Sequence, residues 1–98
     1  MKELCVYILE CADSSYYTGV TNDLERRLWE HNEGVDPKAY TYKRRPVKLV
    51  FSDWFPSPEQ AIAFEKQVKG WRREKKKALI EGRYQDLEGL SKRYHPNK

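Results

Sequence analysis

The chain has 98 residues, of which 39% are hydrophobic and 35% are charged. A chain of this length forms one domain with a modest core, so we expect a single domain over residues 1–98, with its core over about 3–81 and a tail over about 82–98. The composition excludes an extensively disordered chain, and the net charge of +4 with a pI near 9.1 favours an anionic partner.

The two cysteines, Cys5 and Cys11, are six residues apart in one predicted strand. At roughly 3.3 Å per residue they lie about 20 Å apart, too far for a disulfide, which needs Cα atoms within about 7 Å. Free thiols are typical of a reducing compartment. The longest apolar run, residues 6–9, is too short for a signal peptide or a membrane span. We therefore expect a cytoplasmic protein with no membrane association.

The first predicted elements form a β-hairpin followed by a helix. Residues 3–10 are apolar at odd and even positions, which predicts a strand covered on both faces. A turn at 12–15 leads to a return strand over 16–21, where Gly19 indicates a bulge or a close backbone approach. Asn22 is the predicted N-cap, Glu25 completes a capping box, and the helix runs to about Glu33 before Gly34 ends it.

After a loop over 35–45, the second half of the chain predicts a strand and two helices. Residues 46–55 alternate as a strand, and Ser57 and Pro58 begin a helix that extends to about Lys69. A basic helix covers 72–81, and Leu87 and Leu90 of the tail are expected to pack on the domain. The order β-β-α-β-α-α predicts an α+β fold, a mixed α/β sandwich with few strands.

Two polar residues of the first helix fall on its apolar side. On a helical wheel, Arg27 and His31 lie beside the leucines, whereas Arg26 and Glu30 point to solvent. Arg27 and His31 therefore border the core or line a cleft beside it.

The second helix has a carboxylate within its apolar stripe. Glu65 lies among Ala61, Ile62, Phe64, Val68 and Trp71. A buried unpaired carboxylate costs several kcal/mol, so Glu65 requires a cation, a set of donors or a metal ion. One interpretation is structural: Arg27 pairs with Glu65 as a strut between helices, the tyrosines are strand aromatics, and His31 complements the helix dipole. The other is that these groups converge on one cleft that handles phosphate.

Four segments carry a resemblance to a known family. These are the triplets Cys5-Val6-Tyr7 and Tyr17-Thr18-Gly19, the strand and helix over 17–32, and the segments 44–50 and 64–71. In this order and spacing, over residues 4 to about 80, the sequence resembles the GIY-YIG nuclease superfamily. It is most similar to the small stand-alone bacterial members of the UPF0213 type.

The resemblance implies a three-stranded antiparallel sheet flanked by helices and a metal-dependent endonuclease that hydrolyses DNA phosphodiesters. By position, Tyr7 is the general base or orients the attacking water, and Tyr17 holds the scissile phosphate or that water. Arg27 stabilises charge on the transferring phosphate, and His31 assists by hydrogen bonding. Glu65 is the one protein ligand of a Mg²⁺ or Mn²⁺ ion. Tyr7 and Tyr17 share a sheet face only if paired residue numbers sum to an even value.

Contacts with DNA are expected to come from the basic side chains Arg44, Arg45, Lys69, Arg72, Arg73, Lys75, Lys76 and Lys77. Phosphate contacts do not read sequence, so we expect structure-directed or weakly selective cleavage in DNA repair or recombination. We also expect a monomer, with targeting by a protein partner. The alternatives are a non-catalytic nucleic-acid-binding adaptor of the same fold, or an interaction protein whose Arg27–Glu65 pair is only a strut.

Overall fold

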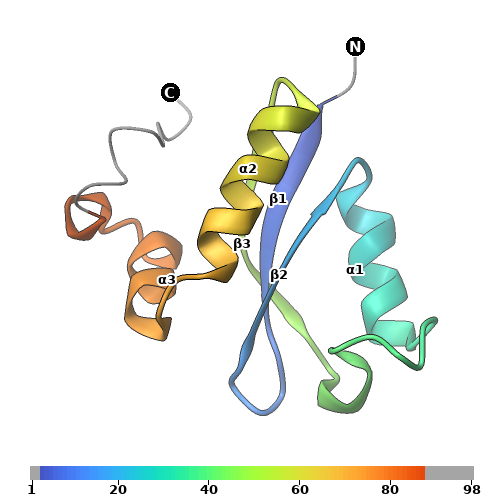
Figure 1. Cartoon of the computed structure of the whole chain (residues 1–98). Coiled ribbons are helices and arrows are strands. Elements are labelled where there is room, and N and C mark those ends of the chain that lie inside the picture. The colour runs from blue at the N-terminus through green and yellow to red at the C-terminus, as the bar shows by residue number, and fades with distance from the viewer. Residues whose placement is uncertain (1–2, 88–98) are drawn as a thin grey trace.

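The computed structural model describes residues 3–87 as a three-stranded antiparallel sheet with helices on both faces, which confirms the predicted α+β class and element order (Figure 1). The strands are in the order β2-β1-β3, and α1 lies on one face while α2 and α3 lie on the other. The elements are β1 (Leu4–Glu10), β2 (Tyr16–Thr21), α1 (Leu24–Glu33), the 3₁₀ turn η1 (Tyr42–Arg44), β3 (Lys48–Phe55), α2 (Pro58–Lys69), α3 (Arg73–Ile80) and η2 (Tyr84–Asp86).

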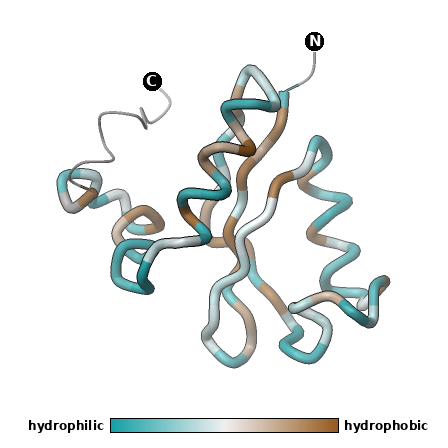
Figure 2. The backbone as a smooth tube through the Cα atoms, in the orientation of Figure 1, coloured by the Kyte–Doolittle hydropathy of each residue, from teal (hydrophilic) through white to brown (hydrophobic). Residues whose placement is uncertain are grey.

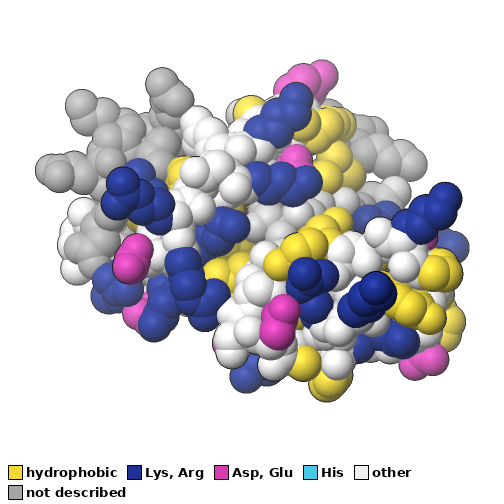
Figure 3. Space-filling view, turned by 60° about the horizontal axis from the view of Figure 1, so that its bottom comes forward, with side chains coloured by type: hydrophobic (Ala, Val, Ile, Leu, Met, Phe, Trp, Pro, Cys, Tyr) yellow, Lys and Arg dark blue, Asp and Glu magenta, His cyan; other side chains and the backbone are white. Residues whose placement is uncertain are grey.

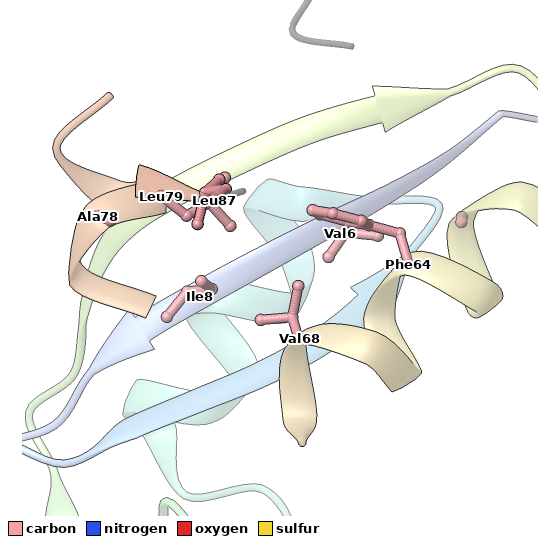
Figure 4. Close-up of a cluster of buried hydrophobic side chains, with 8 residues drawn as sticks. Val6, Ile8, Phe64, Val68, Ala78, Leu79 and Leu87 are labelled. Carbon is pink, nitrogen blue, oxygen red and sulfur yellow. The ribbon is translucent and has the colours of Figure 1, made fainter. Parts of the chain in front are cut away.

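The central strand β1 is buried on both faces, as its apolar composition predicts. Val6 and Ile8 point to the layer formed by α2 and α3, where they meet the buried side chains of those helices (Figure 4). Tyr7 and Leu9 point to the opposite face, where the leucines of α1 pack against them. Figure 2 shows the resulting pattern: hydrophobic residues are concentrated on the central strand β1 and alternate with hydrophilic ones along α2, whereas α1 is mostly hydrophilic.

The hairpin register places the two site tyrosines on one face. Tyr7 pairs with Gly19 and Leu9 with Tyr17, so paired residue numbers sum to 26, an even value. The last pair, Glu10 with Tyr16, leaves the five-residue loop 11–15. Because side chains alternate along a strand, Tyr7 and Tyr17 both point toward α1, as the shared cleft requires.

Capping explains where the first two helices begin. The predicted N-cap Asn22 is wrong by one residue: Asp23 is the N-cap of α1, and its carboxylate accepts a hydrogen bond from the Arg26 backbone N–H at 3.2 Å. Both residue types cap well, and here the Thr21 hydroxyl holds the Asp23 backbone N–H at 3.0 Å. The predicted cap of α2 is confirmed, since the Ser57 hydroxyl accepts from the Gln60 N–H at 3.2 Å.

Strand β3 begins at Lys48, two residues later than predicted, because the backbone of Val47 is hydrogen-bonded to a side chain of α1 and not to a neighbouring strand. The Asn32 side-chain amide, near the end of α1, donates to the Val47 carbonyl at 3.1 Å and accepts from the Val47 N–H at 2.7 Å. This pair of hydrogen bonds fixes the end of α1 to the start of β3. The loop 35–45 between them is thereby held at both ends.

The remaining expectations about the core have mixed outcomes. Leu87 is fully buried as predicted, whereas Leu90 lies outside the described residues. Ile62 was assigned to the apolar stripe of α2 but is exposed, because that stripe is narrower than the wheel suggests. Cys5 and Cys11 are both buried free thiols, so the prediction that they do not pair is confirmed. Within residues 3–87, no helix has the length and apolarity that crossing a bilayer demands.

Candidate active site

Tyr7 lies at the centre of the site, and its position depends on Gly19. Its side chain is 1% exposed and passes directly over Gly19 on β2, its partner in the sheet. A Cβ atom on residue 19 would lie 2.5 Å from the Tyr7 hydroxyl oxygen and 3.1 Å from a ring carbon of Tyr17. The glycine was predicted to mark a bulge or a close approach, and the close approach is what the structure shows.

His31 connects Tyr7 to the loop after α1. Its Nε2 atom lies 3.1 Å from the Tyr7 hydroxyl oxygen, and its Nδ1 atom lies 2.7 Å from the hydroxyl oxygen of Thr41. The imidazole is also 5.1 Å from the ring of Tyr17, measured between ring centroids. His31 is therefore a member of the site and makes the hydrogen bond to Tyr7 that the sequence reasoning expected in general terms.

Arg27 borders the same site, but it does not pair with Glu65. Its guanidinium Nε lies 3.3 Å from a carboxylate oxygen of Glu30, while Arg26 pairs with the other oxygen of Glu30 at 3.2 Å. The alternative prediction of an Arg27–Glu65 ion pair between the helices is therefore wrong. Glu30 was also expected to point to solvent, yet it is half-buried, because the α1 face that borders the cleft is broader than its two leucines indicate.

These side chains surround one pocket of about 230 Å³. Tyr17, Arg27, Glu30 and His31 form its wall on the sheet and α1, and the wall on the other side comes from Gly34, Val35, Asp36, Ala39, Thr41 and Tyr42. Outside that wall, Tyr40 stacks on Tyr17 with a centroid distance of 6.1 Å. The pocket thus combines a guanidinium, an imidazole and phenol groups, which are donors suited to an anion, with the carboxylates of Glu30 and Asp36, and Glu30 is paired with Arg27.

Burial sets the protonation of the two central groups. Burial raises the pKa of Tyr7 to about 12, the neighbouring Tyr17 adds to the rise, and Arg27 opposes it. Burial lowers the pKa of His31, and the positive charge of Arg27 lowers it further. At neutral pH, Tyr7 is therefore protonated and His31 is a neutral imidazole.

Glu65 is 8% exposed, so the prediction of a carboxylate turned inward is confirmed. Its partner is Lys69, one turn later on α2, whose ammonium lies 2.7 Å from a carboxylate oxygen. The Glu65 carboxylate raises the pKa of Lys69, and Tyr17 contributes in the same direction. Glu65 does not itself line the 230 Å³ pocket.

A single carboxylate is a weak but suitable basis for a magnesium site. Mg²⁺ prefers oxygen ligands and is commonly held by one or two carboxylates together with water and substrate phosphate. Within residues 3–87, no group of three or more His, Cys, Asp and Glu side chains converges on a point. Glu65 would offer such an ion an inward-facing carboxylate, one oxygen of which lies 2.7 Å from the Lys69 ammonium.

Two of the predicted DNA-binding arginines are engaged within the protein. Arg44 pairs with Asp13 at 3.1 Å, donates to the Tyr40 carbonyl at 2.7 Å and covers the Tyr40 ring. Arg45 donates to backbone carbonyls of Tyr42 and Asn32 at 2.8 and 3.3 Å. Both guanidinium groups thus stabilise the loop 35–45, which forms the outer wall of the pocket.

The predicted basic residues of α3 form a surface that faces solvent. Lys and Arg side chains gather on the left of Figure 3, where α3 lies. Arg73 covers the ring of Tyr16 at 4.3 Å, and Lys75 lies 5.6 Å from the ring of Trp71. Burial lowers the pKa of Lys76, with a further contribution from Arg73. This basic surface adjoins β2, the edge strand that carries Tyr17.

The sequence reasoning missed Thr41 and Glu30. Thr41 is 1% exposed and contacts His31, ten residues earlier, from a loop without periodicity. No residue pattern links the two, and the aromatic neighbours of Thr41 were the only local signal. Glu30 was detectable, because it lies three residues after Arg27 and four after Arg26, which is the spacing of helical ion pairs.

Comparison with known proteins places this geometry in a wider context. A family profile described as the GIY-YIG catalytic domain matches residues 3–78. A UPF0213 protein of Haloquadratum walsbyi is 49% identical over 76 residues, which cover 78% of this chain and 84% of that protein. The solution structure of a UPF0213 protein from Bacillus halodurans is 42% identical, covers 91% of this chain and 97% of its own, and superposes with a TM-score of 0.54. The solution structure of EF2693 from E. faecalis is 32% identical, covers 100% of this chain and 96% of its own, and has a TM-score of 0.58.

Proposed function

Because the chain belongs to the GIY-YIG family, a nuclease superfamily whose members act on DNA, we propose that it is a divalent-metal-dependent endonuclease that hydrolyses DNA phosphodiester bonds. The observation that carries this proposal is that Tyr17, Arg27 and His31 line one pocket, and that the Tyr7 hydroxyl lies 3.1 Å from His31 Nε2 and its ring 6.3 Å from that of Tyr17. A phosphodiester is an anion of the size and hydrogen-bonding character that this set of donors suits.

Arg27 has the role of stabilising negative charge on the transferring phosphate. Its side chain is 42% exposed, which leaves it open to a substrate, and Glu30 orients it from one turn along the same helix. A preorganised guanidinium is worth most where charge develops in the transition state. Arg27 also lies close enough to Tyr7 to lower its pKa, so it acts on both the phosphate and the phenol.

Tyr7 acts on the attacking water. With a pKa near 12, its phenol is protonated at neutral pH, so it orients water as long as the pocket holds no additional positive charge. It serves as a general base only when further cationic charge lowers that pKa. Tyr17, which is less buried, faces the same pocket and is placed to hold the phosphate or the water by its hydroxyl.

Glu65 is the residue that would hold Mg²⁺ or Mn²⁺. When bound, such an ion polarises the phosphate and offsets the charge that develops on it. Lys69 already neutralises the carboxylate at 2.7 Å, so it must share or give up that contact.

The surface supports structure-directed rather than sequence-specific binding. Lys69, Arg72, Arg73, Lys75, Lys76 and Lys77 offer phosphate contacts along α2 and α3, and such contacts do not read base sequence. Flaps, branches and ends are thus the expected substrates, in DNA repair or recombination in the cytoplasm. Arg44 and Arg45 contribute by supporting the loop that walls the pocket.

The test is a cleavage assay with flapped, branched, single-stranded and duplex DNA, in Mg²⁺ or Mn²⁺. Arg27→Ala and Glu65→Gln should each lower cleavage on the order of 10²-fold or more. Their matched controls are Arg26→Ala, which removes the exposed partner of the same Glu30, and Glu59→Gln, an exposed carboxylate on the same helix as Glu65. Both controls should cleave like the wild type.

Two outcomes would contradict the nuclease. Binding of these DNAs without cleavage, unaffected by Glu65→Gln, would identify a nucleic-acid-binding adaptor of the same fold. Cleavage that survives both Arg27→Ala and Glu65→Gln would show that the bond is broken elsewhere. Cleavage at one defined duplex sequence would refute the structure-directed substrate class while leaving the chemistry in place.

A further inference from the structure

A groove lies where the chain passes from α2 into α3, and we call it the Trp71 groove. Its volume is about 710 Å³, and Trp71 and Arg72, residues of α3, and Arg83 form its walls. None of these residues lines the pocket of about 230 Å³ that Arg27 borders, so the groove is a separate feature of the surface. The sequence placed Trp71 in the apolar stripe of α2, but the residue lies just beyond the end of that helix.

The indole of Trp71 is held in place from the core side. It is partly buried and packs against Phe64, with the two rings at 89° and their centroids 6.1 Å apart, an arrangement that aromatic pairs favour. The Trp71 backbone N–H donates to the Val68 carbonyl at 3.0 Å, which fixes the main chain as well. A ring that is already ordered loses little freedom when a ligand stacks on it. Trp71 is therefore both part of the core and a preformed wall of the groove.

The charge of the groove favours an anionic ligand. Arg72 and Lys75 lie on either side of Trp71 in the sequence, and within residues 3–87 neither side chain forms an ion pair. Arg83 is a third cation, and it pairs with Glu81 at 2.9 Å. Glu74 is the one carboxylate among the described lining residues. Even with the paired Arg83 set aside, the positive charges of the groove outnumber this carboxylate.

Basic side chains continue beyond the groove, which favours a strand over a single nucleotide as its ligand. They gather on this part of the surface (Figure 3) and include Lys69 at the end of α2 and Arg73, Lys76 and Lys77 on α3. An aromatic ring among cations suits a single-stranded nucleic acid, because its phosphates contact the cations while an unpaired base stacks on the ring. The bases of a duplex are already stacked on one another, so they leave no face for the indole.

We propose that the Trp71 groove binds an unpaired arm of DNA, with one base stacked on Trp71 and the neighbouring phosphates on Arg72 and Lys75. The ammonium of Lys75 now lies 5.6 Å from the centre of the indole ring. Its flexible stem lets it move to a phosphate when a base takes that place, and the contact it loses is weaker than base stacking.

A role of this groove in cleavage rests on the proposed nuclease function, whereas the binding of DNA does not. The groove begins directly after α2, and Glu65 lies in the last turns of that helix. An arm held in the groove is therefore retained next to the helix that carries the proposed metal ligand. This placement explains in physical terms why flaps and branches would be preferred to continuous duplex.

The experiment measures binding by fluorescence anisotropy in EDTA, where metal-dependent cleavage does not occur. One labelled single-stranded DNA has all its bases, and a second of equal length has abasic nucleotides at its centre but keeps every phosphate. The wild type should bind the abasic DNA about tenfold more weakly, the scale of one lost stacked base. Trp71→Leu keeps an apolar side chain against Phe64 but removes the aromatic face, so it should bind both DNAs equally weakly.

Three controls separate stacking from charge and from folding. Trp71→Phe keeps a ring and should retain most of the preference for intact bases. Trp29→Leu changes an exposed tryptophan of α1 and should bind like the wild type. Lys75→Gln should lower the slope of log affinity against log salt by about 0.7, the value for one phosphate contact on a single strand. Trp71→Leu should leave that slope unchanged.

Tryptophan fluorescence gives a direct signal even if Trp71→Leu fails to fold. The chain has three tryptophans, so a variant that combines Trp29→Phe with Trp54→Phe leaves Trp71 as its only indole. The DNA with intact bases should quench this fluorescence by stacking, and DNA that is abasic throughout should not.

Specific results would overturn this inference. Equal binding of intact and abasic DNA by the wild type would show that charge alone holds the strand. An equal loss of duplex and single-strand binding in Trp71→Leu would exclude an unpaired base as the ligand, and markedly tighter binding of RNA would exclude DNA as the occupant. Stacking without cleavage of flapped DNA would refute the nuclease but leave the groove assigned. Cleavage of a flap with an abasic arm at an unchanged KM would refute the groove but leave the nuclease, so the two failures are distinguishable.

Discussion

Replacing Gly19 by alanine tests whether the site depends on the close passage of Tyr7 over β2. The added Cβ would lie 2.5 Å from the Tyr7 hydroxyl oxygen and 2.6 Å from the ring carbon that bears it, whereas ordinary contacts begin at 3.4 Å. The phenol must therefore retreat by about 0.9 Å, although Tyr7 is fully buried and has little space to move into. A movement of that size disturbs the 3.1 Å hydrogen bond to His31.

The expected cost appears in both stability and activity. Overpacking of this kind destabilises by about 1–3 kcal/mol, and each kcal/mol lowers Tm by about 4–8 °C in a domain of this size. Misplacement of a reacting group by about 1 Å costs on the order of 10²-fold in rate. Scanning calorimetry and a cleavage time course on flapped DNA measure the two effects separately.

Gly70 provides the matched control. It ends α2 with φ of −86°, and a Cβ there would meet only the Gln67 carbonyl oxygen, at 3.6 Å. Gly70→Ala should therefore leave Tm and cleavage close to those of the wild type. The reasoning would be refuted if Gly19→Ala were as stable and active as Gly70→Ala, because Tyr7 would then not occupy the space above residue 19.

Three further predictions address protonation, capping and the charge on Glu65. The stabilising effect of the buried Tyr7 phenol is complete below about pH 10 and is lost as pH rises through about 12. The stability of the wild type relative to Tyr7→Phe should therefore be constant up to about pH 10 and fall between about pH 10 and 12 in urea titrations; a constant difference over that range would contradict a raised pKa. Ser57→Ala removes the N-cap of α2 and should cost about 1 kcal/mol, seen as a lower Tm with unchanged affinity for DNA. Lys69→Met removes the ammonium that pairs with the Glu65 carboxylate and should tighten Mn²⁺ binding several-fold, on the scale of an exposed ion pair. The electron paramagnetic resonance signal of free Mn²⁺ measures this binding. Weaker Mn²⁺ binding by Lys69→Met than by a Lys66→Met control would show that the Lys69 ammonium does not compete with the metal for Glu65.

The sequence predicted those features that depend on periodicity or local chemistry. Apolar residues at both odd and even positions placed both faces of β1 in the core, and the capping pattern of Ser57 and Pro58 located the start of α2. The wheel also identified Arg27 and His31 as residues at the border of the core. In each case neighbours in sequence are neighbours in space, so a short window contains the physical information.

The features that the sequence did not predict depend on contacts between distant segments. Thr41 meets His31 only because Asn32 and Val47 fix both ends of the intervening loop. The inward contacts of Arg44 depend in the same way on the hairpin turn at Asp13, 31 residues earlier. A pair of basic residues in a loop is most often solvated, so the sequence alone indicated that Arg44 and Arg45 bind DNA. The structure shows that both side chains contact other groups of the protein.

The failure to predict the partner of Glu65 has a different cause, because the spacing of the two residues in the sequence already indicated the pair. Lys69 lies four residues after Glu65, the arrangement in which a glutamate and a lysine pair best on a helix. The pairing considered was instead with Arg27, as a strut between the two helices. The flexible stem of lysine lets its ammonium reach a carboxylate at the rim of the core while the head remains in water.

The proposed function requires groups from both layers to act at one site, and the position of β2 at the edge of the sheet is compatible with that requirement. Tyr7 and Tyr17 project toward α1, whereas Glu65 belongs to α2 on the opposite face, and a central strand would separate them. At an edge, a side chain from the α2 layer passes beside the strand instead of through the sheet. On the α2 side of this edge, Lys69 pairs with Glu65 at 2.7 Å. The edge strand β2, which would otherwise be open to pairing with another strand, thus carries Tyr17 on its α1 face and contacts α2 on its other face.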